Sequence, residues 1–176
     1  MAYHGTVTAD GPLHRFLSAD HARLDALLRQ AVAPGGGVDM EVYRGFRGGI
    51  LRHIGMEERV LMPASKEDRG GEPLPVAARL RVDHHAISLL VIPTPTPGIL
   101  ATLAGILVPH NILEEKEGGF YRECERLAGD GVDALYARMM AVPELPLAAH
   151  VDTAEIMAYL ARTLDERRRF LASRDA

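Results

Sequence analysis

The chain has 176 residues, of which 47% are hydrophobic, with a mean hydropathy of −0.02 and a formal net charge of −4. The length predicts a single domain, and a mean hydropathy close to zero is typical of a soluble globular protein. The mild negative charge, without a basic stripe, argues against a nucleic-acid partner, and the single cysteine, Cys124, excludes an internal disulfide and favours a reducing cytoplasm.

Two long amphipathic helices are predicted in the first part of the chain. The first spans about residues 10–32, with Asp10 as its candidate N-cap, and ends before the Pro-Gly-Gly-Gly turn at residues 34–37. The second spans about residues 39–62 and is expected to end at Pro63, because proline interrupts a helix. Three glycines within it indicate close packing against another helix: Gly45, Gly48 and Gly49.

A third and a fourth helix are predicted on either side of a proline-rich turn. The third spans about residues 75–91, and the turn occupies residues 92–98. The fourth opens at Thr96, its cap, and extends to about Leu127. Pro109 lies inside this helix and is expected to remove a backbone hydrogen bond and to kink it.

Two further helical segments are predicted beyond residue 128. A short one covers about residues 129–140. Residues 152–155 resemble a capping box with Asp152 in the capping position, and they open a last amphipathic helix. The region 129–176 is therefore expected to form a helical extension, packed on the preceding helices or in a dimer interface.

Neither a signal peptide nor a membrane span is expected. The first five residues lack both a charged region and an apolar core. The longest uncharged stretch, residues 86–109, is long enough to raise the question of a membrane helix, but its prolines and Gly98 divide it into two short pieces. The expected location is the cytoplasm, without a membrane partner.

A metal-ligand pattern occurs twice in the first four helices. A single histidine on one helix is followed by His-x-x-x-Glu on the next, which gives six candidate ligands: His21, His53, Glu57, His84, His110 and Glu114. Residues four apart on an α-helix share one face, so each His-x-x-x-Glu pair can converge on one centre. The residues around the two single histidines match at identical offsets, and this register selects His84 rather than His85.

The ligand types indicate two borderline metal ions. Imidazole nitrogen beside carboxylate oxygen suits iron, manganese or zinc better than Mg²⁺ or Ca²⁺. Six protein ligands are too many for one open catalytic metal and fit two metals bridged by carboxylates. The acidic residues that follow the two motif glutamates, Glu58 and Glu115, are turned aside by about 100° and are expected to face solvent or to support a ligand from outside.

The chain resembles the hemerythrin-like, cation-binding HHE domain family over about residues 13–127. The patterns that carry the resemblance are Asp20-His21-x-x-Leu24, His53-x-x-x-Glu57-Glu58-x-x-Leu61-Met62-Pro63, Asp83-His84-x-x-Ile87 and His110-x-x-x-Glu114-Glu115. It implies an all-α, up-down-up-down four-helix bundle over residues 1–128, with the extension 129–176 added to it. It also implies that the six candidate ligands hold two non-haem iron ions, bridged by oxo and carboxylate groups, with zinc or manganese as alternatives.

The oxygen carriers of this family use a fifth histidine, whereas Leu80 and Ser88 stand four residues before and after His84. The chain is therefore more similar to bacterial members with four histidines and two glutamates, which are linked to oxygen or redox sensing, nitric oxide chemistry, iron handling and iron–sulfur cluster repair. A vacant coordination position would favour reaction with O₂, peroxide or NO. The leading hypothesis is a di-iron protein that interacts with O₂ or a related diatomic, in binding, sensing or iron handling.

Two other functional classes remain open from the sequence. In the first, the chain is a di-iron oxidoreductase or repair-type protein that acts on peroxide or NO or donates iron. In the second, the metal is structural, and either residues 99–108 or the last helix forms a homodimer surface. The alternative to metal binding is that the four histidines are unrelated and bonded to their neighbours, which the internal repeat disfavours.

Overall fold

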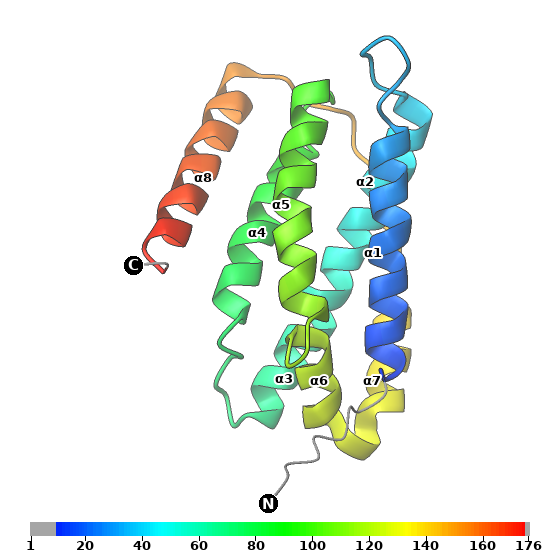
Figure 1. Cartoon of the computed structure of the whole chain (residues 1–176), viewed down its shortest axis with the longest axis vertical. Helices are drawn as coiled ribbons and strands as arrows, with labels where there is room; N and C mark the ends of the chain where they lie inside the picture. The colour runs from blue at the N-terminus through cyan, green and yellow to red at the C-terminus, as the bar shows by residue number, and fades with distance from the viewer. Residues whose placement is uncertain (1–9, 175–176) are drawn as a thin grey trace, which may run out of the picture.

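The computed structural model describes residues 10–174, so the expectation about the first five residues lies outside it. The described chain is all-α, as predicted, and forms no strand beyond an isolated bridge between Val32 and Val38. Four of its helices lie side by side, with successive helices running in opposite directions (Figure 1). They are α1 (Pro12–Gln30), α2 (Met40–Met56), α4 (Ala77–Leu90) and α5 (Pro97–Glu115).

The cap of α1 comes from a distant part of the chain. Asp10 makes no cap, contrary to the prediction, and the N-cap residue is Gly11. The Glu125 carboxylate of α6 (Phe120–Ala128) instead accepts hydrogen bonds from the backbone N–H groups of Leu13 and His14 at 2.8 and 3.0 Å. A Cβ on Gly11 would lie 2.3 Å from this carboxylate, so a larger residue at this position would displace the carboxylate that caps α1.

The second helix does not end at Pro63. A π-helical segment, η1 (Glu57–Leu61), follows α2 without a break and leads into α3 (Met62–Asp68). Pro63 lies in the first turn of α3, and the wider π turn relieves the clash that its ring would make with the carbonyl of Arg59 in a regular helix. The predicted close packing of this region is found at Gly49, where a Cβ would lie 2.6 Å from Leu24 Cδ2 of α1.

The fourth predicted helix is divided in two. α5 continues through Pro109 but ends at Glu115, and α6 begins at Phe120 after a turn that contains Gly118 and Gly119. Gly118 has a φ of +66°, and a Cβ on Gly119 would lie 2.7 Å from the carbonyl oxygen of Glu114. The turn therefore requires glycine, and it returns α6 to pack against α1, α3 and α5.

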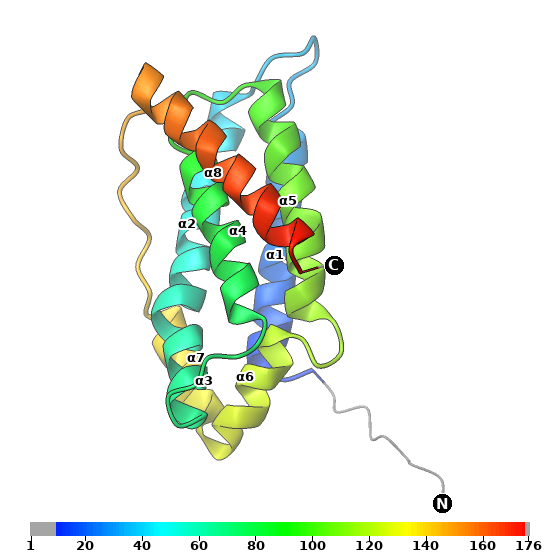
Figure 2. The ribbon, with the colours of Figure 1, turned by 90° about the vertical axis from the view of Figure 1, so that its left-hand side faces the viewer.

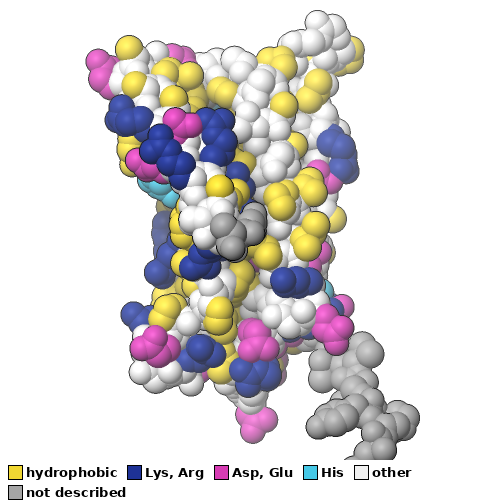
Figure 3. Space-filling model, turned by 60° about the vertical axis from the view of Figure 1, so that its left-hand side comes forward, with side chains coloured by type: hydrophobic (Ala, Val, Ile, Leu, Met, Phe, Trp, Pro, Cys, Tyr) yellow, Lys and Arg dark blue, Asp and Glu magenta, His cyan; other side chains and the backbone are white. Residues whose placement is uncertain are grey.

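The C-terminal region is helical, as predicted. A 3₁₀ turn, η2 (Gly129–Gly131), leads into α7 (Val132–Met140), which packs against α1 and η1. The last helix, α8 (Ala154–Ala172), lies against α4 (Figure 2). Its cap is Thr153, whose side chain accepts from the Ile156 N–H, whereas the predicted cap Asp152 accepts hydrogen bonds from Thr94. The outer surface near α8 carries both basic and acidic side chains (Figure 3).

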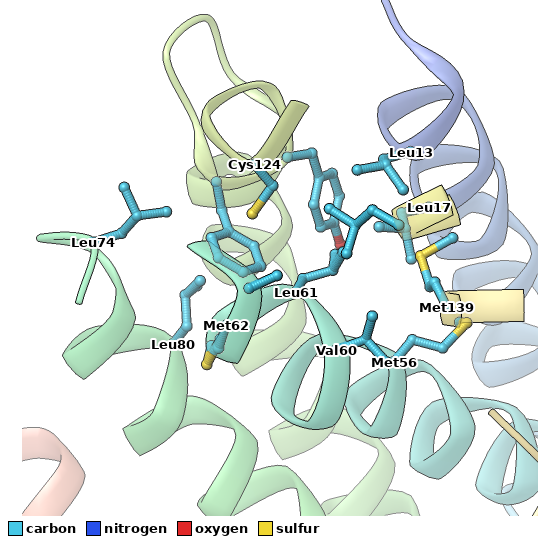
Figure 4. Close-up of a cluster of buried hydrophobic side chains, with 14 of the residues drawn as sticks. Leu13, Leu17, Met56, Val60, Leu61, Met62, Leu74, Leu80, Cys124 and Met139 are labelled. Atoms are coloured by element: carbon cyan, nitrogen blue, oxygen red, sulfur yellow. The ribbon is translucent and has the colours of Figure 1, made fainter. Parts of the chain in front are cut away.

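The apolar core consists of two clusters. The first includes Leu13, Leu17, Met56, Leu61, Leu80 and Cys124 and is drawn in Figure 4. The second includes Leu24, Leu28, Phe46, Ile50, Ile87 and Leu103. On α1, His21 lies between Leu17 of the first cluster and Leu24 of the second, and on α4 His84 lies between Leu80 and Ile87. A polar layer therefore separates two apolar regions.

One stretch within Pro97–Met140 is long and apolar enough to cross a membrane, with a mean hydropathy of 1.2 over the best window. This is weak support for a membrane span, because core helices pass the same test. The window is 39% buried, and α5 turns His110 and Glu114 into the protein interior.

Candidate metal centre

The six predicted ligands meet in the polar layer. His21 lies on α1, His53 on α2, Glu57 at the start of η1, His84 on α4, and His110 and Glu114 on α5; each is at most 4% exposed. Their donor atoms form two overlapping groups, within each of which all donors lie within 4.8 Å of one another. The first group contains His21, His53, Glu57 and Glu114, and the second contains Glu57, His84, His110 and Glu114. Both glutamates belong to both groups.

Each shared glutamate directs its two oxygens to different groups. Glu57 Oε1 lies 3.4 Å from His53 Nε2, and Glu57 Oε2 lies 3.1 Å from His84 Nε2. Glu114 Oε2 lies 3.3 Å from His21 Nε2, and Glu114 Oε1 lies 3.2 Å from His110 Nε2. A carboxylate placed in this way can bridge two metal ions.

Unpartnered polar atoms show that the residues present fit such ions. Among the described residues, Glu57 Oε2, His84 Nε2 and Glu114 Oε1 are buried and make no well-oriented hydrogen bond, although the first two lie 3.1 Å from each other and Glu114 Oε1 lies 3.2 Å from His110 Nε2. Burying polar atoms without well-oriented hydrogen bonds is costly, and a cation between them would satisfy all three. The two overlapping groups could therefore hold metal ions and are consistent with a dinuclear site; their nitrogen and oxygen donors suit borderline cations.

The Nδ1 atom of each of the four candidate-ligand histidines contacts a carboxylate. The four pairs are His21 Nδ1 with Glu115 Oε1 at 2.5 Å, His53 Nδ1 with Asp20 Oδ2 at 2.8 Å, His84 Nδ1 with Glu58 Oε1 at 2.8 Å, and His110 Nδ1 with Asp83 Oδ2 at 3.4 Å. These carboxylates orient the rings so that each Nε2 faces the centre. Glu58 and Glu115 thus support ligands from outside, one of the two roles considered for them.

Burial and charge set the protonation of the metal-free centre. Burial lowers the pKa of His53, but the charge of Glu57 and the hydrogen bond to Asp20 outweigh it and raise this pKa to about 9. Burial and the charge of Glu114 raise the pKa of Glu57, but His53 and His84 outweigh them and lower it to about 2. Protonated histidines therefore face ionised glutamates, and a metal must displace protons in order to bind.

Tyr121 of α6 was not among the predicted site residues, yet its hydroxyl reaches the centre. The side chain is fully buried, and its Oη donates to Glu57 Oε1 at 2.7 Å. Burial, together with the charges of Glu114 and Glu57, raises the pKa of Tyr121 well above its ordinary value. Along a continuous helix, Tyr121 would lie about 10 Å from Glu114, and the turn after α5 removes this distance. The paired glycines at 118 and 119, directly after the ligand helix, are the sequence signal for that turn.

Three other histidines of residues 10–174 lie outside the donor groups: His14, His85 and His150. His85 is exposed, and its Nε2 lies 3.2 Å from the hydroxyl of Tyr159 on α8. His14 is buried, and its Nε2 lies 2.9 Å from the backbone carbonyl oxygen of Glu115. The structure thus places His84 at the centre and its neighbour His85 at the surface.

The C-terminal helix α8 contacts Asp83, one of the carboxylates beside the candidate-ligand histidines. Arg167 of α8 donates from Nε to Asp83 Oδ1 at 2.6 Å, and Arg79 donates to Asp83 Oδ2 at 3.0 Å. Asp83 in turn contacts His110. An interaction path therefore runs from α8 to a candidate ligand.

A cavity of about 300 Å³ lies between α1 and α5. Its lining includes His21 and Glu115 together with Ser18 and Asn111. One candidate ligand and its supporting carboxylate therefore stand at the edge of a hollow large enough for small molecules.

Comparisons with protein-family models, curated proteins and solved structures find no match for this chain. The donor geometry and the motif pattern therefore carry the functional inference.

Proposed function

We propose that this chain is a hemerythrin-like protein whose centre holds two non-haem iron ions and interacts with O₂ or a related diatomic, in binding, sensing or iron handling. The observation that carries the proposal is the division of the Glu57 and Glu114 oxygens between two histidine pairs. The side-by-side arrangement of α1, α2, α4 and α5 supports the four-helix bundle that this family implies.

Iron is the proposed metal because of the donor chemistry and the resemblance of the motifs. Each group offers two imidazole nitrogens and two carboxylate oxygens, which iron, manganese and zinc all accept. When bound, iron would supply redox chemistry and a position for a diatomic ligand. Zinc would not supply the redox chemistry, because Zn²⁺ does not change its oxidation state. The chain's own residues hold the donors rigid, because a carboxylate fixes each ring and apolar clusters lie on both sides.

The proposal includes a cytoplasmic location, a small diatomic ligand such as O₂, with peroxide or NO as alternatives, and neither a nucleic-acid nor a membrane partner. A homodimer through α8 or residues 99–108 remains a further expectation.

The test is metal analysis of protein produced with ample iron, combined with near-ultraviolet absorbance after exposure to O₂. About two irons per chain and a new absorbance band are expected. A matched pair of neighbouring variants provides the control: His84→Ala should lower the iron content, and His85→Ala should not. Less than one iron per chain in the unmodified protein would overturn the proposal. Sustained consumption of peroxide or NO with a reductant would favour the oxidoreductase alternative over reversible binding.

A further inference from the structure

The two donor groups differ in their contact with Tyr121, a difference that the repeated sequence pattern does not indicate. The Tyr121 hydroxyl lies against the first group only. Its Oη is 2.7 Å from Glu57 Oε1, 3.1 Å from Glu114 Oε2, 3.1 Å from His21 Nε2 and 3.2 Å from His53 Nε2. One oxygen atom is thus close to all four donor atoms of that group.

These four distances are compatible with a fifth ligand. Metal–donor bonds of about 2.0–2.2 Å place neighbouring ligands at right angles roughly 3 Å apart. An oxygen about 3 Å from all four donors is therefore close enough to join them in coordinating an ion that they surround. Phenolic oxygen is a hard donor suited to ferric iron.

The second group has no such neighbour among the described residues. Glu57 Oε2, His84 Nε2 and Glu114 Oε1 make no well-oriented hydrogen bond, and their nearest polar neighbours are donors of the same group. Leu80, four residues before His84 on α4, is fully buried in the first apolar cluster and offers no donor. The second group therefore supplies four protein donors, whereas the first supplies five when Tyr121 is counted.

The fold fixes Tyr121 in this position. Its side chain is fully buried in the first apolar cluster, which surrounds the ring and leaves the hydroxyl directed at the centre. The ring also lies beside His14 and Phe120, with centroid separations of 6.2 and 5.9 Å. The Gly118–Gly119 turn sets the start of α6 and hence the place of Tyr121.

We propose that the phenolic oxygen of Tyr121 is a fifth protein ligand of the metal held by His21 and His53, which leaves the metal held by His84 and His110 as the one that accepts a small exogenous ligand. The inference rests on the proposed di-iron function. Coordination breaks the phenol O–H bond, forms an oxygen–metal bond and releases the proton to solvent, with no change in oxidation state.

The test uses the full chain loaded with ferric iron. A coordinated tyrosinate gives a visible charge-transfer band and resonance-enhanced ring vibrations when the protein is excited within that band. Tyr121→Phe should retain most of the iron and lose both signals. Tyr43→Phe is the matched control, because Tyr43 is equally buried, lies in the other apolar cluster and has an unpartnered hydroxyl; it should retain both signals.

A second measurement does not depend on the folding of a variant. Unmodified protein produced with ring-deuterated tyrosine should show shifted ring vibrations in the charge-transfer band. Azide is the probe for the open position, and it should bind to the iron-loaded protein without removing the tyrosinate band.

The outcomes separate the two proposals. Iron below one per chain would overturn the di-iron function and the ligand assignment together. Two irons without isotope-sensitive tyrosinate vibrations would overturn the ligand assignment alone. Loss of the tyrosinate band on saturation with azide would show that azide displaces Tyr121 and would overturn the assignment of the open position.

Discussion

The Nδ1 atom of His53 lies 2.8 Å from Oδ2 of Asp20, which directly precedes the candidate ligand His21 on α1. The same relationship recurs around the centre. Asp20 of α1 supports a histidine of α2, Glu58 supports one of α4, Asp83 of α4 supports one of α5, and Glu115 supports one of α1. Each acidic neighbour of a ligand thus orients a ligand on a different helix, and the four contacts close a ring.

Replacing Asp20 should weaken metal binding although Asp20 contributes no donor. We expect Asp20→Ala to lower metal affinity roughly 10- to 100-fold, because the His53 ring loses the contact that fixes its tautomer and orientation. Competition with a chelator measures the affinity. Asp25→Ala is the control, since Asp25 lies on the same helix but is exposed and pairs with Arg29. Equal affinities of the two variants would contradict the role assigned to Asp20.

The sharing of the glutamates predicts different metal losses for two ligand variants. His53→Ala removes a donor from one group and should lower the metal content by about one ion per chain, whereas Glu114→Ala removes donors from both groups and should affect both ions. Metal analysis measures the difference, and circular dichroism should show only a modest loss of helicity, because apolar clusters lie on both sides of the centre. Complete unfolding of both variants, or equal metal losses, would show the prediction to be wrong.

The parts of the fold that depend on local periodicity were predictable from the sequence. Apolar residues at helical spacing predict an all-α chain, and a spacing of four places His53 with Glu57, and His110 with Glu114, on common faces. The positions at which the helices end were harder to predict from the sequence. Proline normally ends a regular helix because its ring clashes with the carbonyl four residues earlier. The π turn Glu57–Leu61 widens the backbone before Pro63, so the helix continues through it.

The surroundings of the centre depend on contacts between helices, which periodicity does not determine. Nothing in the order Asp20-His21 indicates that the aspartate contacts His53 of another helix. The position of Tyr121 also depends on contacts between helices. The predicted continuous helix would place Tyr121 far from Glu114, whereas the turn between α5 and α6 brings it back to the centre. The Gly118–Gly119 turn determines its position, and glycine pairs signal a turn without giving its direction.

The stability of the metal-free protein and its affinity for metal should change in opposite directions as the pH rises. The pKa of His53 rises from 6.5 to about 9 on folding, so its contribution to stability is complete below 6.5 and is lost as the pH rises through about 9. The pKa of Glu57 falls from 4.5 to about 2, so its contribution is present above 4.5 and is lost as the pH falls through about 2. The free energy of unfolding of metal-free protein should therefore decrease, by a few kcal/mol in order of magnitude, between about pH 6.5 and 9.

Metal affinity should increase over the same range, because the imidazolium groups must lose their protons before they can bind a cation. Denaturant unfolding of metal-free protein measures the first slope, and metal titration in buffers of different ionisation enthalpy measures the release of protons. His53→Ala should flatten the first slope. A metal-free protein whose stability rises with pH between 6.5 and about 9 would contradict the assigned protonation.

The contact of α8 with Asp83 predicts that a residue far from the centre influences one metal position. Arg167 donates to Asp83 Oδ1, and Asp83 contacts His110 Nδ1, so Arg167→Ala should weaken binding at the position held by His84 and His110. The loss should be on the order of a few-fold, below the 10- to 100-fold expected for a residue that touches a ligand, because Arg79 still pairs with Asp83.

Arg168→Ala is the control for this effect, since Arg168 is the neighbouring residue on α8 and pairs with Asp165 at the exposed surface. Chelator competition with each variant measures the affinity, and the melting temperature of the metal-free variants reports whether α8 has loosened from α4. A change in melting temperature alone, with equal metal affinity in both variants, would show that α8 stabilises the fold without acting on the centre. A lower affinity for Arg167→Ala at an unchanged melting temperature would show that the C-terminal helix orients His110 through Asp83.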